Sequence, residues 1–273
     1  MKETKVLYTS NGPYKYDLYE HDEADETVAL FHGFTGSRST WKQVAKSLNR
    51  SYKVIVIDLP GHGDTQLTKP FSMQTFAADF VELLKNEAVK KTHLIGYSLG
   101  GRTALSLTCY YPQFVDKLIL ESASPGLSDL KESEQRRNQD AKLANFIEKE
   151  GIEAFVDYWE HIPLFKSQNK LSNERQAKIR HGRLNQSAEG LSKSLRYMGT
   201  GSQPSWWDDL SELVNKTFLI TGQLDSKFVH INQQMEKLIS DCKHITIPNV
   251  GHAVHLENEA VYIETIYKCL QAN

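Results

Sequence analysis

The chain has 273 residues, of which 40% are hydrophobic, and its 32 basic and 34 acidic side chains give a formal net charge of −2. This length can bury a large core, and the near-neutral charge argues against nucleic acid as the main partner. No apolar run approaches a membrane span, and Met1-Lys2-Glu3-Thr4-Lys5 lacks an apolar signal core, so we expect a cytoplasmic protein without a membrane span.

β-type runs alternate with helical patterns along most of the chain. In chain order, the expected strands are 6–8, 14–19, 27–31, 54–57, 93–96, 117–121, 217–221 and 244–247. The expected helices are 73–85, 99–111, 231–239 and 258–271. The later strands are continuous apolar runs, which is typical of buried parallel strands. We therefore expect an α/β fold with a mostly parallel eight-stranded sheet, helices on both faces, and the active site at the carboxyl ends of the strands.

The loops after the first two apolar strands are rich in glycine and histidine. His32-Gly33-Phe34 follows the strand at 27–31, where Gly33 would let the backbone approach a site. The Phe34 N–H is therefore a candidate oxyanion donor. His32 is interpreted as a structural partner of this loop, and so is His62 in Asp58-Leu59-Pro60-Gly61-His62-Gly63, which closes the strand at 54–57.

The most informative motif is Gly96-Tyr97-Ser98-Leu99-Gly100, which lies between an apolar strand and the start of a helix. This G-x-S-x-G pattern predicts a nucleophile elbow, a turn so tight that a Cβ at either glycine would collide across it. The turn would project the Ser98 hydroxyl outward. It would also leave the Leu99 N–H free at the helix start, as a second oxyanion donor beside Phe34.

Residues 126–204 break the alternation, because they contain no convincing strand. The segment is polar, helical and rich in aromatic and arginine residues. We interpret it as a helical cap inserted over the active site, so that residues 1–125 and 205–273 form the core.

A serine needs a histidine to take its proton and an acid to orient that histidine. Asp225 follows the strand at 217–221, and His252 follows the strand at 244–247, in the chain order expected after such an elbow. Ser98, Asp225 and His252 are therefore the predicted triad. The alternatives are His255 for the histidine and, for the acid, Asp208, Asp209 and Asp241.

These motifs together resemble the α/β-hydrolase family over the whole chain. A narrower resemblance, to the 2-succinyl-6-hydroxy-2,4-cyclohexadiene-1-carboxylate synthases of menaquinone biosynthesis, lies in motifs that ordinary esterases do not share. These motifs are Gly96–Arg102, Glu121 with Pro125-Gly126-Leu127, Glu134-Gln135-Arg136-Arg137, Asp157-Tyr158-Trp159 and Asp225-Ser226-Lys227-Phe228. The resemblance implies a lyase that removes pyruvate from an enolpyruvyl-bearing cyclohexene, with the serine acting as a base.

The substrate of that family carries three carboxylates, for which arginines are suited because they pair with carboxylates at two points. Arg102 lies one helical turn after Ser98 and should therefore point near the site. The resemblance adds Arg136 and Arg183, with Arg137 and Arg180 as their respective alternatives. It also implies Tyr97, Trp159 and Lys227 as further substrate contacts.

The predicted reaction requires no cofactor and no metal, and the expected partner is a small anionic substrate. Cys109, Cys242 and Cys269 are odd in number and lack metal-ligand spacing, which indicates reduced structural thiols. The oligomeric state, monomer or homodimer, stays open. The main alternative function is hydrolysis of a carboxylate-bearing ester or carbon–carbon bond, and a more distant one is a non-catalytic binding protein on the same fold.

Overall fold

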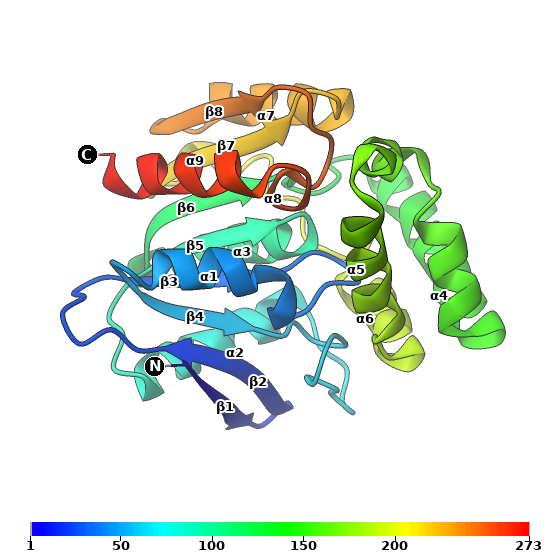
Figure 1. Cartoon of the computed structure of the whole chain (residues 1–273), viewed down its shortest axis with the longest axis horizontal. Coiled ribbons are helices and arrows are strands. Elements are labelled where there is room, and N and C mark those ends of the chain that lie inside the picture. The colour runs from blue at the N-terminus through cyan, green and yellow to red at the C-terminus, as the bar shows by residue number, and fades with distance from the viewer. Residues whose placement is uncertain (1, 273) are drawn as a thin grey trace.

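The computed structural model describes residues 2–272, which form one eight-stranded sheet in the order β1-β2-β4-β3-β5-β6-β7-β8 (Figure 1). The strands are β1 (Lys2–Thr9), β2 (Gly12–Tyr19), β3 (Thr27–Phe31), β4 (Lys53–Ile57), β5 (Thr92–Tyr97), β6 (Val115–Glu121), β7 (Lys216–Gly222) and β8 (Cys242–Ile247). β2 is antiparallel to both β1 and β4, and all other neighbouring strands are parallel. The predicted fold class is confirmed.

The helices are α1 (Lys42–Leu48), α2 (Met73–Asn86), α3 (Leu99–Tyr110), α4 (Leu130–Trp159), α5 (Asn173–Leu184), α6 (Ala188–Met198), α7 (Ser226–Leu238), α8 (Val254–Glu257) and α9 (Glu259–Gln271). Short 3₁₀ helices are η1 (Arg38–Trp41), η2 (Pro112–Phe114), η3 (Pro163–Lys170) and η4 (Leu210–Glu212). The sequence did not predict α1, whose seven residues are too few for a clear apolar period. α7 begins five residues before the predicted start at 231, because Asp225 caps it through the Phe228 N–H.

Helices cover both faces of the sheet, as the alternating pattern predicted. On one face, α2, α3 and α7 bury apolar side chains such as Phe76, Leu105 and Met235 against the strands. On the other face, α1 and α9 do the same with residues that include Val44 and Tyr262. The central strands are thereby buried on both sides, which fixes the positions of the loops at their carboxyl ends.

The segment 126–204 contains α4, η3, α5 and α6 and no strand, and Figure 1 shows α4, α5 and α6 gathered on one side of the sheet. α4 is interrupted at Gly151, whose φ of 84° and ψ of 176° are non-helical. The segment has its own apolar cluster, which joins α4 to α6. Its description as a cap separate from a core stays a prediction, and Met1 and Asn273 of that core lie outside the described residues.

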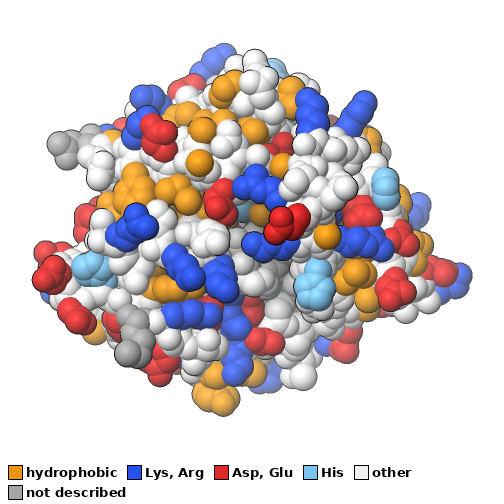
Figure 2. Space-filling view, viewed as in Figure 1, with side chains coloured by type: hydrophobic (Ala, Val, Ile, Leu, Met, Phe, Trp, Pro, Cys, Tyr) orange, Lys and Arg blue, Asp and Glu red, His pale blue; other side chains and the backbone are white. Residues whose placement is uncertain are grey.

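Within residues 2–272, no helix is both long and apolar enough to cross a membrane. The face seen in Figure 2 carries basic and acidic side chains together with small groups of apolar ones. The three cysteines are free thiols on α3, β8 and α9, and burial raises the pKa of each to about 12.

Candidate active site

Ser98 lies on a sharp turn between β5 and α3, with a φ of 50° and a ψ of −107°. Such a backbone conformation is strained for a residue other than glycine, and it occurs where a site requires it. The glycines on either side make the turn possible. A Cβ at Gly96 would overlap the backbone of Gly100, and one at Gly100 would overlap the Phe31 carbonyl of β3.

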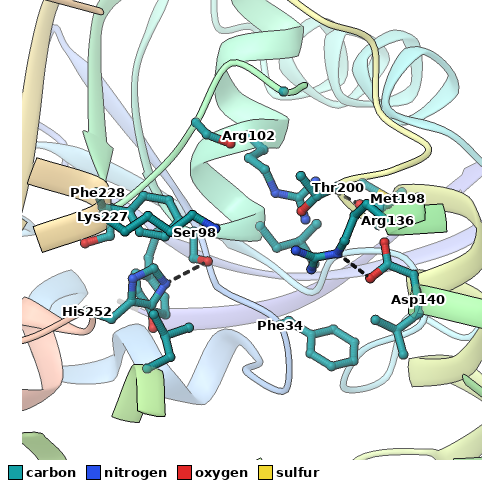
Figure 3. Close-up of a pocket in the computed structure, with 18 of the residues that line it drawn as sticks. Phe34, Ser98, Arg102, Arg136, Asp140, Met198, Thr200, Lys227, Phe228 and His252 are labelled. Atoms are coloured by element: carbon teal, nitrogen blue, oxygen red, sulfur yellow. Dashed lines mark hydrogen bonds and ion pairs between the residues drawn. The ribbon is translucent and has the colours of Figure 1, made fainter. Parts of the chain in front are cut away.

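The three residues predicted as a triad lie together. His252 Nε2 is 3.1 Å from the Ser98 hydroxyl (Figure 3). On the other side of the ring, His252 Nδ1 is 2.6 Å from Asp225 Oδ2. His252 Nδ1–H can donate to the carboxylate, which leaves Nε2 as the acceptor for the serine proton. Asp225 and His252 are buried, whereas Ser98 is partly exposed. This arrangement can draw a proton from Ser98 and so make its oxygen a stronger base or nucleophile.

The alternative histidine, His255, is engaged elsewhere. Its Nδ1 lies 2.9 Å from both carboxylate oxygens of Glu121, and its ring packs against Trp41. Asp225 is the acid within hydrogen-bond distance of the His252 ring, so the geometry favours it over the three other aspartates.

The loop that carries Phe34 rests on two buried histidines. His32 Nδ1–H donates to the Gly33 carbonyl at 2.8 Å, and its Nε2 accepts the Leu59 N–H at 3.0 Å. His62 Nδ1–H donates to the Pro60 carbonyl at 3.1 Å, and its ring packs edge-on against Phe34. Burial lowers the pKa of His62 to about 4 and that of His32 well below its ordinary value. Both rings are therefore neutral, and their contacts are consistent with the structural role expected from the sequence.

Ser98 opens onto a cavity of about 480 Å³ between the ends of the strands and the helical segment. Phe34, Leu99 and His252 line it from the sheet side, and Trp159 and Phe165 line it from the segment 126–204. The Phe34 ring lies 5.4 Å from the Trp159 ring, and the Trp159 ring lies 5.8 Å from the Phe165 ring. An apolar ring could therefore lie between the aromatic side chains and Ser98.

Cationic side chains also line this cavity. Figure 3 shows Arg102 and Arg136 pointing into it from the side away from His252, while Lys227 lies on the same side as His252. Arg136 Nε donates to Asp140 Oδ1 at 2.8 Å, whereas Arg137, the alternative, reaches the Gly201 carbonyl outside the cavity lining. A carboxylate-bearing ligand could thus be bound at more than one point.

The Arg102 guanidinium forms hydrogen bonds with the end of α6 and with the loop after it. Its Nη1 donates to the Met198 carbonyl at 2.9 Å and to Oε1 of Gln203. Burial, and then the nearby charge of Arg136, lower the pKa of Arg102 to about 9, while Asp140 opposes the shift. Arg102 stays charged at neutral pH, and a bound anion would relieve the cost of that partly buried charge.

Tyr97 lines the cavity beside His252, with the two ring centres 5.4 Å apart. Burial, and then Glu121, raise the pKa of the Tyr97 phenol well above its ordinary value, so the phenol is a neutral donor.

Arg183 does not line this cavity, so the structure does not bring it into direct reach of a ligand beside Ser98. Its guanidinium stacks on Phe165 at 4.8 Å and donates to Gln168 Oε1 at 3.1 Å. Arg180, the alternative, is paired with Asp157 and Glu160, each at 2.6 Å. Both arginines line a second cavity of about 150 Å³. A contact of either arginine with the substrate stays a prediction.

Some residues of the cavity were missed by sequence reasoning. The Asp140 carboxylate is 3% exposed and accepts hydrogen bonds from Arg136 and from the Gly201 N–H. The signal in the sequence was its position four residues after Arg136, which places both side chains on one face of a helix. Ser122 and Ser194 line the cavity with buried hydroxyl groups that lack a partner among the described residues. No sequence pattern marks either serine.

The chain matches the family model described as alpha/beta hydrolase fold over residues 26–259. A Bacillus subtilis (strain 168) protein named, provisionally, as a 2-succinyl-6-hydroxy-2,4-cyclohexadiene-1-carboxylate synthase is 42% identical over 246 residues, which are 89% of each chain. The structure of MenH from S. aureus is similar with a TM-score of 0.91 and 35% identity, over 94% of this chain and 97% of that one. A malate-bound thermophilic esterase from Thermogutta terrifontis has a TM-score of 0.85 and 25% identity, with 98% of each chain covered.

Proposed function

Because this chain belongs to the α/β-hydrolase fold family and, within it, to the 2-succinyl-6-hydroxy-2,4-cyclohexadiene-1-carboxylate synthases, we propose that it is a carbon–oxygen lyase of menaquinone biosynthesis. The substrate is 2-succinyl-5-enolpyruvyl-6-hydroxy-3-cyclohexene-1-carboxylate. The products are 2-succinyl-6-hydroxy-2,4-cyclohexadiene-1-carboxylate and pyruvate.

The observation that carries this proposal is the position of the cations relative to Ser98. One cavity contains the Ser98 hydroxyl together with the side chains of Arg102, Arg136 and Lys227. A neutral ester would gain little from these guanidinium groups, and the partial burial of Arg102 costs free energy of desolvation. A substrate with three carboxylates would gain both affinity and orientation from them.

In the first step, Ser98 acts as a base on the ring proton next to the succinyl ketone. His252 takes the serine proton on Nε2 and is stabilised as an imidazolium by Asp225. The Ser98 oxygen then takes the ring proton, and the electrons of that C–H bond move onto the ketone oxygen. The N–H groups of Phe34 and Leu99 stabilise the resulting dienolate, because donors already in place need no reorganisation.

In the second step, the dienolate re-forms the ketone, the ring double bonds shift, and the C–O bond to the enolpyruvyl group breaks. The leaving group departs as the enolate of pyruvate and takes up the proton held by His252, so charge and protons balance. Arg102 and Arg136 hold carboxylates during both steps and keep the breaking bond aligned. None of these steps calls for a covalent bond to Ser98.

The test is turnover of this substrate by the wild type and by Ser98→Ala, with pyruvate followed by coupling to lactate dehydrogenase. We expect the variant to be slower by ~10³-fold or more while remaining folded, because only one oxygen is lost. Activity of the variant within tenfold of wild type would exclude Ser98 as the base. Intact-protein mass spectrometry during turnover is the companion measurement, and an adduct on Ser98 would contradict a base-only role.

The second candidate function is hydrolysis of a carboxylate-bearing ester through an acyl-enzyme. It is favoured by the short Ser98–His252–Asp225 contacts, which suit a nucleophile as well as a base, and by the similarity to the malate-bound esterase. Rapid cleavage of a simple ester, with no pyruvate from the cyclohexene, would support this candidate instead.

A further inference from the structure

The carboxylate of Glu257, the last residue of α8, holds the backbone on both sides of His252. Oε2 accepts the Gly251 N–H at 2.7 Å, and Oε1 accepts the Ala253 N–H at 3.4 Å. One side chain therefore accepts hydrogen bonds from the N–H groups of the residues immediately before and after the histidine that faces Ser98.

The same carboxylate also binds the helical segment. The Ser167 hydroxyl of η3 donates to Glu257 Oε1 at 3.0 Å, across 90 residues of sequence. The two loops touch directly at this point, because a Cβ at Gly251 would overlap the Ser167 hydroxyl. Figure 1 shows α8 on the side of the molecule that faces α4, α5 and α6.

η3 also supplies part of the cavity wall. Phe165, two residues before Ser167, lines the cavity, and its ring lies 6.2 Å from the His252 ring. A displacement of η3 would therefore change the wall that faces a ligand and, through Ser167, the carboxylate that fixes the His252 loop.

We propose that Glu257 is a positioning residue for His252, and that the Ser167–Glu257 hydrogen bond couples the placement of the helical segment to that of His252. The lyase part of this inference rests on the proposed function, whereas the positioning of His252 does not. The required chemistry is specific to a carboxylate: it accepts from three donors at once, whereas the amide of a glutamine has one acceptor oxygen and would turn its NH₂ toward a backbone N–H.

The experiment uses the full-length protein and two assays. The first measures the rate at which a small uncharged fluorophosphonate labels Ser98, which requires the Ser98–His252 contact and no substrate carboxylate. The second measures pyruvate release from the enolpyruvyl cyclohexene. The variants are Glu257→Gln and Ser167→Ala, with Glu264→Gln, an exposed acid paired with Lys268, and Ser128→Ala, an exposed serine, as matched controls.

We expect Glu257→Gln to slow labelling by about tenfold and to lower kcat more than it raises KM, because charge-assisted hydrogen bonds at the His252 loop are lost. Ser167→Ala should leave labelling within twofold of wild type and slow pyruvate release by about threefold to tenfold. In the double variant, the loss of Ser167 should add nothing to the effect of Glu257→Gln on pyruvate release. Both control variants should stay within twofold of wild type in labelling rate and in pyruvate release.

If Glu257→Gln is labelled as fast as the control Glu264→Gln, the role of Glu257 in positioning His252 is overturned. The coupling between the helical segment and His252 would be overturned by unchanged pyruvate release in Ser167→Ala, or by additive effects in the double variant. The Ser167→Ala result decides this point even if Glu257→Gln does not fold. A wild type that is labelled rapidly but releases no pyruvate would refute the proposed function, and the labelling result for Glu257 would still stand.

Discussion

Arg102 offers a sharp test of how the cavity recognises its substrate. The side chain projects from α3 one turn after Ser98, and its Nη1 is already bound to the Met198 carbonyl and to Gln203. Its remaining nitrogens can pair with a carboxylate at two points while Nη1 keeps these contacts. A lysine has one nitrogen and cannot make both sets of contacts, so Arg102→Lys and Arg102→Ala should be impaired to a similar extent.

The magnitude follows from the type of contact. Loss of a charge-assisted hydrogen bond costs about 1.5–3 kcal/mol, which corresponds to roughly 10–150-fold in kcat/KM. Pyruvate release would be measured for Arg102→Ala, Arg102→Lys and Arg137→Ala, whose arginine lies outside the cavity lining. Thermal melting of each variant separates lost binding from lost folding, because the alanine leaves the Met198 carbonyl without this donor. Near-normal activity in Arg102→Lys would show that charge alone suffices, and normal activity in both variants would make Arg102 a structural residue.

Three further predictions follow from the cavity and its supports. Arg136→Ala should raise KM by roughly 3–10-fold, whereas Arg137→Ala should leave KM unchanged, because only Arg136 of this pair lines the cavity. Equal effects of the two substitutions on KM in steady-state kinetics would contradict this. KM should rise between low and moderate salt, since ions screen the attraction between substrate carboxylates and these cations over about 8–10 Å, and a salt-independent KM would argue for a neutral substrate. Acid should destabilise the fold through His62, because its pKa is about 4 in the folded protein and 6.5 in the unfolded chain. The unfolded chain therefore binds the proton first as the pH falls from 6.5 toward 4. The free energy of unfolding should drop by roughly 2 kcal/mol between pH 7 and pH 5. Urea unfolding at the two pH values should therefore show a smaller difference for His62→Gln than for wild type, and equal differences would show that His62 is not responsible.

The parts of the site that the sequence predicted are those set by local backbone rules. A serine between two glycines at the end of an apolar strand can adopt few conformations, and here it takes the strained one. Asp225 and His252 each follow a strand of the same parallel sheet, whose carboxyl ends lie at one edge. The contacts of Ser98, His252 and Asp225 could therefore be anticipated from motif order alone.

The helical segment could not be predicted at the same level, because its side-chain positions depend on breaks and packing that leave little trace in sequence. The interruption of α4 at Gly151 reorients the chain within what looks like one helical run. Arg183 illustrates the consequence, since its guanidinium stacks on Phe165 and lines the smaller cavity instead of the main one. The contacts of Glu257 with Gly251, Ala253 and Ser167 are likewise tertiary, and no local pattern indicates them.

The most direct test of the proposed reaction is to follow pyruvate and the cyclohexadiene together while the wild-type protein acts on 2-succinyl-5-enolpyruvyl-6-hydroxy-3-cyclohexene-1-carboxylate. Pyruvate is measured through lactate dehydrogenase, and the conjugated product through its ultraviolet absorbance. We predict that the two products form at the same rate and in equal amounts, and that Ser98→Ala abolishes both above the uncatalysed background. A folded wild-type protein that forms neither product while it cleaves a simple ester would contradict the lyase assignment.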